Sequence, residues 1–179
     1  MPDGPSYGRA GPGMMTRMRV THEVRYDAPV ETVRAMLTDP AFRERATLAM
    51  GASAVSVRVA EGSVEIDMAS QPHHVPAFLR PVIGEKIHAV HAEHWTGDEA
   101  AFSVTTSLVP AGLHGRRALI ADGDGCLDRF DGEAHARIPL VGGRIERLIA
   151  DRLEEGWDIE HGVGVAWLAQ HSGRSGGDR

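Results

Sequence analysis

Apolar and polar residues alternate in twos along much of the chain, which is the period of a half-buried β-strand. Residues 17–26 predict a first strand, and residues 53–69 predict a hairpin that turns at Glu61-Gly62. The apolar row of the first strand is Met18, Val20, Val24 and Tyr26. In the hairpin, Val55, Val57 and Val59 are expected opposite Val64, Ile66 and Met68.

Two further hairpins follow the same rhythm. Residues 86–108 are expected to turn at Thr96-Gly97-Asp98, and residues 116–138 are expected to turn at 122–125. The first of these carries the row Phe102, Val104, Thr106 and Leu108, and the last strand alternates Ala134, Ala136 and Ile138 with Glu133, His135 and Arg137. We expect Gly132 to form a bulge that bends this last strand.

The apolar spacing changes to threes and fours in three places, which predicts helices. A short helix is expected over residues 27–39 with Pro29 in its first turn, and a second one over 40–51. Residues 140–168 predict a helix about 40 Å long. Its apolar stripe is Val141, Ile145, Leu148, Ile149, Leu153, Trp157, Val163 and Trp167, opposite Arg144, Arg147, Asp151, Glu154, Glu155 and Asp158.

We expect a ligand cavity where the last strand connects to the long helix. Small residues face each other there, because the strand offers Ala134 and Ala136 while the helix carries Gly156, Gly162 and Gly164. Each glycine costs a helix about 1 kcal/mol relative to alanine. Close packing of the helix, or its early end near Gly162, explains these glycines equally well.

The connection "SQPHHVPAFLRPVIGEK" supports the cavity. Its prolines argue against a strand, and yet it is rich in apolar residues such as Phe78 and Leu79. A connection this apolar is expected to cover something, and we interpret it as a short helix or flap over the mouth of the cavity.

These elements predict an α+β domain in which a curved antiparallel sheet of about seven strands wraps around a long C-terminal helix, with two short helices after the first strand. The order resembles the START-like, or polyketide-cyclase (SRPBCC), superfamily and its helix-grip fold. The stretches "VRYDAPVETVRAMLTDPAF", "AEHW", "GEAHARIPLVGG" and "AWL" carry the resemblance. More narrowly, "PLVGGRIERLIA" is similar to a bacterial family of unknown function within it. The superfamily implies an internal hydrophobic pocket, used for purposes from lipid carriage to aromatic cyclisation.

Charge and composition exclude several classes of protein. The formal net charge is −6, which argues against a nucleic-acid partner. Arg116–Arg117 and Arg144–Arg147 are interpreted as solvated faces, and the single cysteine, Cys126, as a small buried filler. No apolar run is long enough for stable membrane insertion and no signal segment is recognised, so a cytoplasmic protein is expected.

The folded domain is expected over residues 17–169. Residues 1–16 are rich in Gly and Pro and are expected to be a disordered extension, or to lie upstream of a start at Met14, Met15 or Met18. Residues 170–179 are expected to be a disordered tail. The sequence leaves open whether the protein is a monomer or a homodimer.

Candidate metal and cofactor motifs are weak. Alternation on a strand sends His88 and His94 to one face and His91 to the other, which is poor geometry for zinc even with His73 and His74 nearby. "DGDGCLDRFD" places Cys126 and Leu127 where a calcium loop needs an oxygen ligand and glycine, so we interpret it as a hairpin turn. No metal or other cofactor is expected.

The favoured hypothesis is a protein that binds an apolar or amphipathic small molecule, lipid-like or polyketide-like, between the sheet and the long helix. One alternative is a cyclase, aromatase or hydrolase that uses His22, His91 or Glu93 as a general base, with no catalytic set to name. Another is an interaction module whose interior is filled by its own side chains. The candidate ligand-binding residues are Val20, His22, Val24, Ile66, Met68, Phe78, Leu79, His91, Glu93, Phe102, Val104, Thr106, Ala134, Ala136, Ile138, Leu153 and Trp157.

Overall fold

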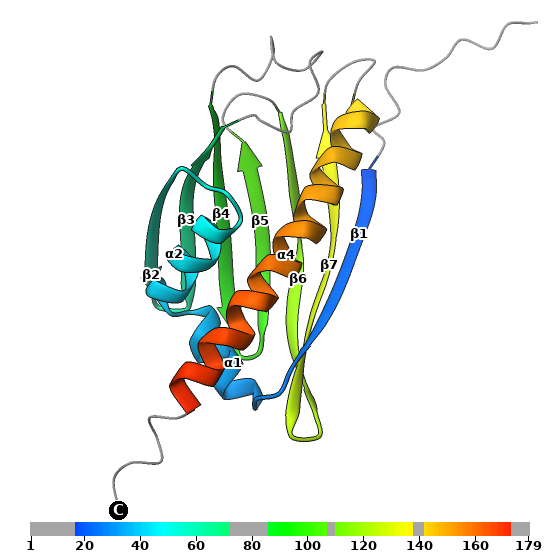
Figure 1. The fold of residues 1–179 in the computed structure, drawn as a ribbon. Helices are drawn as coiled ribbons and strands as arrows, with labels where there is room; N and C mark the ends of the chain where they lie inside the picture. Colours follow the sequence, from blue (N-terminus) through cyan, green and yellow to red (C-terminus); the bar gives the residue numbers. More distant parts are fainter. Residues whose placement is uncertain (1–16, 72–85, 107–109, 138–141, 173–179) are drawn as a thin grey trace, which may run out of the picture.

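The computed structural model describes residues 17–71, 86–106, 110–137 and 142–172, and its sheet is antiparallel with strand order β1-β7-β6-β5-β4-β3-β2. The strands are β1 (Arg17–Tyr26), β2 (Ala54–Ala60), β3 (Ser63–Ser70), β4 (Ile87–Thr96), β5 (Glu99–Thr106), β6 (Ala111–Asp122) and β7 (Gly125–Ala136). The helices are α1 (Val30–Leu37), α2 (Pro40–Ala49) and α4 (Gly142–Ser172). Figure 1 shows α4 lying diagonally across the sheet.

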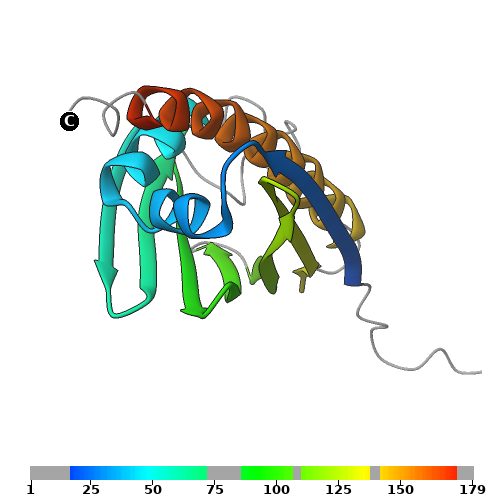
Figure 2. The same ribbon diagram turned by 90° about the horizontal axis from the view of Figure 1, so that it is seen from below.

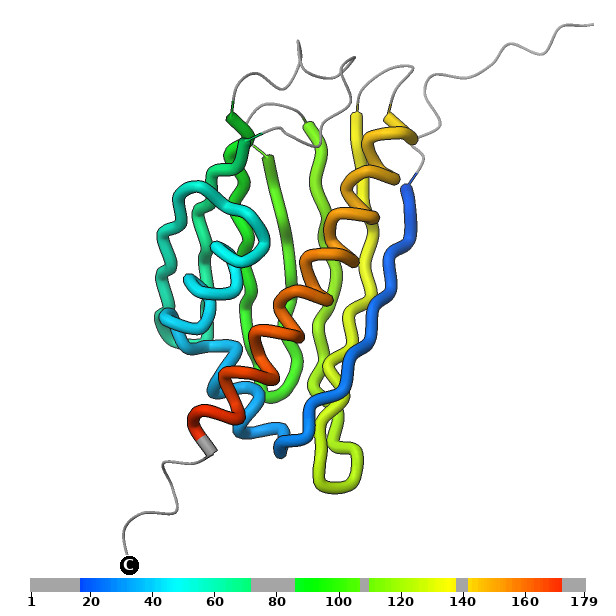
Figure 3. The backbone as a smooth tube through the Cα atoms, viewed as in Figure 1, coloured from blue at the N-terminus to red at the C-terminus, as the bar shows by residue number. Residues whose placement is uncertain are grey.

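The sheet is curved, and all the helices lie on its concave side. Seen from below, the strands curl beneath α4, while α1 and α2 fill the end of the hollow near the last turns of α4 (Figure 2). The tube view shows β6 and β7 running as one long hairpin from the upper to the lower end of the sheet (Figure 3). This arrangement is the helix-grip fold that the sequence predicts.

The strand register confirms the predicted division into inner and outer faces. Val55 pairs with Met68, Val57 with Ile66 and Val59 with Val64, as the hairpin pattern requires. The ladder then carries the same face across the sheet from Ile66 to His91, Val104, Leu113 and Ala134. A slip of one residue would have reversed every face.

Local sequence accounts for the turns and for the start of α2. Glu61 and Gly62 have φ values of 44° and 81°, the pair of positive angles that a two-residue type I′ hairpin needs. Pro40 begins α2, and Asp39 caps it by accepting hydrogen bonds from the backbone of Ala41 at 2.8 Å and of Phe42 at 3.3 Å. Pro29 precedes α1 rather than lying in its first turn.

The expected bulge at Gly132 is wrong. Gly132 pairs with Val20 on one side and with Gly115 on the other in an unbroken register. A Cβ on Gly132 would lie 2.4 Å from the carbonyl oxygen of His114 and 2.8 Å from the Phe130 ring, so glycine allows close packing here. The sheet therefore curves without an extra residue in β7.

The helix α4 has the predicted faces, and it continues past Gly162 to Ser172. All six charged residues predicted for its outer side are exposed, while Ile145 and Trp157 are buried. Gly164 is buried, and a Cβ there would lie 2.8 Å from Cε1 of Tyr26. Gly164 therefore allows the helix to pack closely on the strand and does not leave space for a ligand. A Cβ on Gly162, in contrast, would meet nothing within 4 Å.

Some sequence predictions fall outside the described residues. They concern the proposed flap with Phe78 and Leu79, the strand end at Leu108 and Ile138, the helix position Val141, and the segment 1–16. Of the expected tail 170–179, residues 170–172 belong to α4 and the rest lie outside the described residues. Among the described helices, none combines the length and hydrophobicity that a membrane span requires.

Candidate functional site

Among the described residues, five charged side chains form one connected, buried group between the sheet and the helices. They come from five different elements, and each side chain is at most 6% exposed. The residues are Arg43 of α2, Glu93 of β4, Arg117 of β6, Asp128 of β7 and Glu160 of α4. We call them the charge cluster. A charge removed from water is tolerated only where partners satisfy it, and here every member has such partners.

Arg117 is at the centre of the cluster. Its Nε and Nη2 donate to the two oxygens of Asp128 at 2.9 and 2.6 Å, which is the bidentate geometry that guanidinium favours. The same side chain donates to Glu93 at 3.0 Å and to Glu160 at 2.5 Å. Arg117 thus joins β4, β7 and α4 to its own strand.

Glu93 is saturated with hydrogen-bond donors. One oxygen accepts from Arg43 at 2.5 Å and from the indole of Trp95 at 2.8 Å. The other accepts from Arg117 at 3.0 Å and lies 3.0 Å from Nε2 of His91. Arg43 also donates to Glu160 at 3.0 Å and to the carbonyl oxygen of Leu37, so that α1, α2 and α4 meet at one guanidinium.

The cluster fixes its own ionisation. Burial alone would raise the pKa of Glu93, but Arg43 and Arg117, with His91, hold that pKa well below its ordinary value. The pKa of Glu160 is lowered in the same way, against burial, by Arg117 and Arg43. An ionised Glu93 whose oxygens already accept four donors is a poor general base, which weakens the sequence-based suggestion that it performs proton transfer.

Five rings cover the charge cluster on the side of the N-terminal half of α4, and we call them the aromatic layer: His22, His91, Phe102, Phe130 and Trp157. Trp157 lies with its ring centroid 4.2 Å from Phe130 and 6.0 Å from Phe102. His22 stacks on Trp157 at 5.3 Å, and His91 lies 4.5 Å from Phe102. These rings fill the middle of the space where the sequence predicts a cavity.

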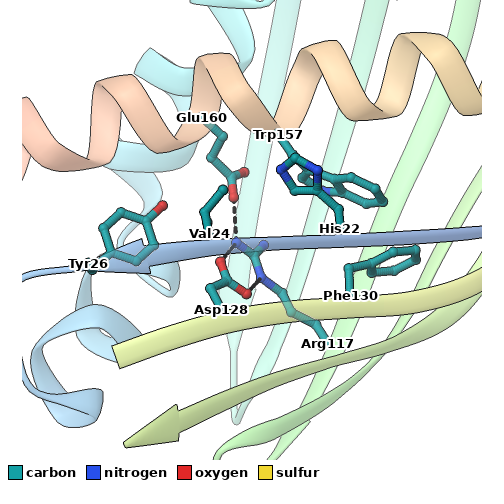
Figure 4. Close-up of a pocket in the computed structure, with 8 residues that line it drawn as sticks. All are labelled: His22, Val24, Tyr26, Arg117, Asp128, Phe130, Trp157 and Glu160. Atoms are coloured by element: carbon teal, nitrogen blue, oxygen red, sulfur yellow. Dashed lines mark hydrogen bonds and ion pairs between the residues drawn. The ribbon is translucent and has the colours of Figure 1, made fainter. Parts of the chain in front are cut away.

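A small cavity remains between β1, β7 and α4 (Figure 4). Its volume is about 10 Å³, roughly the space for one water molecule. Its lining is His22, Val24, Tyr26, Arg117, Asp128, Phe130, Trp157 and Glu160. Nε2 of His22 is buried without a hydrogen bond, although it lies 3.4 Å from Oδ1 of exposed Asp158. A cavity of this size holds no lipid-like molecule.

At the end of the sheet near the first turns of α4, the described residues cover the concave face less completely. Three pairs of successive elements end and begin at this edge of the sheet. They are β3 and β4 at Ser70 and Ile87, β5 and β6 at Thr106 and Ala111, and β7 and α4 at Ala136 and Gly142. Beside the buried pair Ala111 and Ile145, several inward-pointing apolar side chains here are only half-buried: Met18, Met68, Val104, Ile149 and Leu153. We call this region the open end. On the opposite side of the aromatic layer, Leu119 and Cys126 are fully packed.

The candidate ligand-binding residues that the structure describes fall in four groups. Four are inward-facing but only half-buried near the open end or at its rim: Met68, Val104, Thr106 and Leu153, with Ala136 beside them. Buried around the aromatic layer are Val20, Ile66, His91, Phe102, Ala134 and Trp157. His22 and Val24 line the small cavity, and Glu93 belongs to the charge cluster. Phe78, Leu79 and Ile138 lie outside the described residues.

Sequence reasoning misses four members of the cluster. It groups Arg117 with Arg116 as solvated, but Arg117 is 3% exposed and Arg116 is 81% exposed. Alternation gives the reason, because Arg117 shares the inward phase of Leu113 and Leu119. Arg43, Asp128 and Glu160 are absent from the sequence-predicted site, although Glu160 follows Trp157 by one helical turn.

The outer face of the sheet carries the exposed histidines. His88 and His94 point outward and His91 inward, as predicted, and the described residues contain no group of side chains suited to a metal ion. The acidic stretch after Asp122 is a tight hairpin at Gly123-Asp124. A depression of about 310 Å³ lies on this face beside Ser63 and His94, whose Oγ and Nδ1 are 2.9 Å apart.

Solved structures of similar fold are distant in sequence. The TTHA0849 protein of Thermus thermophilus has a TM-score of 0.62 at 16% identity, over 87% of this chain and 99% of that one. Norcoclaurine synthase of Thalictrum flavum, in complex with dopamine and hydroxybenzaldehyde, has a TM-score of 0.62 at 11% identity, over 94% and 98%. A START superfamily protein of Mycobacterium smegmatis has a TM-score of 0.56 at 12% identity, over 85% and 97%.

These likenesses confirm the START-like fold and leave the chemistry open. No curated protein sequence matches this chain significantly. A family model does match, over residues 21–168, which is most of the chain and all the described elements except the first part of β1 and the last turn of α4. The chain therefore belongs to the DUF2505 family, whose members are described as proteins of unknown function.

Proposed function

We propose that the protein binds an apolar or amphipathic small molecule at the open end, between the N-terminal half of α4 and the concave face of the sheet. The observation that carries this proposal is the half-buried state of inward-facing apolar side chains there, including Val104 and Leu153. Apolar area that the described residues leave partly uncovered gains about 25 cal/mol per Å² when a ligand covers it.

The filled middle of the domain limits where such a ligand lies. The aromatic layer and the charge cluster occupy the space toward the C-terminal half of α4. The ligand would therefore lie against Phe102 and Trp157. Because the opposite side of the aromatic layer is filled, entry of the ligand is expected from the open end.

The fold supports the proposal by analogy only. The Thalictrum flavum synthase was solved with dopamine and hydroxybenzaldehyde, so a chain of this fold holds small molecules. One alternative, an interaction module with a filled interior, is favoured by the small volume of the cavity in Figure 4. The two functions differ in whether the open end takes up an apolar compound.

The test is native mass spectrometry of the purified protein, together with a titration of the uncharged dye N-phenyl-1-naphthylamine. We expect a bound small molecule or saturable uptake of the dye. Leu153→Glu, which sets a charge at the open end, should weaken uptake at least tenfold. The matched control is Val165→Glu on the exposed side of the same helix, where the residue is 49% exposed, and it should change nothing.

Uptake that is absent, or that is equally sensitive to both substitutions, would contradict the proposal. Absence of any uptake by a folded protein would favour the interaction module. A comparison of the circular dichroism spectra of both variants with that of the unmodified protein separates loss of binding from loss of fold.

A further inference from the structure

His91 stands at the boundary between the filled interior and the open end. It points inward from β4, between Ile66 of β3 and Val104 of β5, and its ring lies 4.5 Å from Phe102. Its side chain is 9% exposed, while the neighbouring Val104 is half-buried. A polar ring among apolar neighbours at this boundary is suited to contact a ligand on one side and the protein on the other.

Glu93 determines which nitrogen of His91 carries the proton. Nε2 of His91 lies 3.0 Å from Oε1 of Glu93. The carboxylate is held ionised by Arg43 and Arg117, and an ionised carboxylate only accepts hydrogen bonds. Nε2 must therefore donate, so in the neutral imidazole Nδ1 is an acceptor.

The described residues leave the other ring nitrogen, Nδ1, to a partner from outside the domain. Among the described residues, none donates a hydrogen bond to Nδ1 of His91, and its cross-strand neighbours Ile66 and Val104 have apolar side chains. The charge cluster also disfavours an anion nearby, because its three carboxylates outnumber the two guanidinium groups. A ligand in contact with His91 is therefore expected to bind most tightly when it carries a hydrogen-bond donor and no negative charge.

We propose that Nδ1 of His91 accepts a hydrogen bond from the ligand, so that the open end selects apolar molecules with a hydroxyl or N–H group over ones without a donor and over carboxylates. This inference rests on the proposed function and adds the polar specificity of the site. His91 acts here as a contact residue, and Glu93, Arg43 and Arg117 act as positioning residues that fix its tautomer.

The binding test uses three naphthalene probes of nearly equal size: 2-naphthol, 2-methoxynaphthalene and 2-naphthoate. We expect 2-naphthol to bind about tenfold more tightly than the methyl ether, and the carboxylate to bind most weakly. In His91→Phe the preference for 2-naphthol over the ether should disappear while the ether still binds. The matched control, His94→Phe on the outer face of the same strand, should keep the preference.

A second measurement needs no ligand. Nitrogen-15 NMR of the histidine side chains in the unmodified protein should show His91 with hydrogen on Nε2 and an unprotonated Nδ1. The opposite neutral tautomer, or an imidazolium with hydrogen on both nitrogens, would overturn the inference, because Nδ1 could then not accept a hydrogen bond. This readout remains decisive if His91→Phe fails to fold. A purely structural role for His91 would not produce a ligand preference that depends on the donor.

The outcomes separate the two proposals. Equal affinity of 2-naphthol and 2-methoxynaphthalene for the unmodified protein would overturn the role of His91 and leave the proposed function intact. Failure of all three probes, and of the dye, to bind to the folded protein would overturn both.

Discussion

Nη2 of Arg117 lies 2.5 Å from Oε1 of Glu160, and this contact ties the centre of the sheet to α4. Both side chains are buried, and both also bond to other members of the charge cluster. Five elements of the chain therefore depend on one another for the satisfaction of their charges. Interior ion pairs of this kind are fragile to the loss of one partner, because the others are left charged and out of water.

Replacement of Arg117 by Met should be strongly destabilising. The substitution leaves three carboxylates facing one guanidinium in the interior. The expected loss in the free energy of unfolding is about 3–5 kcal/mol, measured by urea denaturation followed by circular dichroism. The neighbouring Arg116→Met is the control, since its side chain is 81% exposed and its loss should change the free energy by less than about 0.5 kcal/mol. Similar losses at both positions would contradict the burial of Arg117.

The cluster should also make the stability fall in acid. The pKa values of Glu93 and Glu160 are lower in the folded chain than their ordinary value of 4.5. Groups of this kind stabilise the fold above their unfolded pKa, and the contribution is lost as the pH falls toward the folded pKa. Urea denaturation should therefore give a constant contribution from these groups near neutral pH and a decline below about pH 4.5.

Two variants separate this effect from general acid denaturation. Glu160→Gln should lower the stability at pH 7 and flatten the decline in acid, because one buried titrating group is gone. Glu155→Gln should leave the pH profile unchanged, since Glu155 is 59% exposed and pairs with exposed Arg152. A decline that is identical in all three proteins would mean that other carboxylates cause it.

The sequence predicts most of the fold because burial repeats with the geometry of each element. Alternation in β2 and β3 sets both the faces and the register, since only one pairing brings Val55 to Met68 and Val59 to Val64 on the same side. The long stripe of α4 needs a large apolar surface to cover, and the concave face of the sheet supplies it. Local signals such as Pro40 after Asp39 place the short helices.

The candidate site is predicted less well, because periodicity distinguishes faces and not partners. Arg117, Asp128 and Glu160 share the phase of buried apolar neighbours, and a charged residue in that phase is a signal that the sequence does contain. What the sequence lacks is the three-dimensional pairing, since Arg43 and Glu160 are 117 residues apart. The volume left between Trp157 and the sheet likewise depends on how side chains interlock, which a pattern of small residues does not determine.

Cys126 should be inert in the folded protein. It is fully buried, and burial, with the nearby Asp128, raises its pKa to about 11, so the thiol stays protonated at neutral pH. We expect Ellman's reagent to label it only after denaturation. Thr105→Cys on the exposed outer side of β5 adds a matched thiol that should react at once in the native state. Rapid native labelling of the unmodified protein would contradict the packing around Cys126.

Two glycines of α4 should respond to alanine in opposite ways. Alanine is favoured over glycine in a helix by about 1 kcal/mol, so Gly162→Ala, with nothing within 4 Å of the added Cβ, should raise the free energy of unfolding by up to that amount. Gly164→Ala instead forces a Cβ to within 2.8 Å of Cε1 and 3.0 Å of Oη of Tyr26. Because Tyr26 is only 1% exposed, its ring has little room to move.

The overpacking at Gly164 should outweigh the gain in helix propensity and leave a net loss of about 1–2 kcal/mol. Thermal denaturation of the two variants beside the unmodified protein measures both effects, and the opposite signs are the expected result. A gain at both positions would mean that α4 shifts away from Tyr26 at little cost. In that case the C-terminal half of α4 would be loosely packed, and the interior between it and the sheet would no longer limit a ligand to the open end.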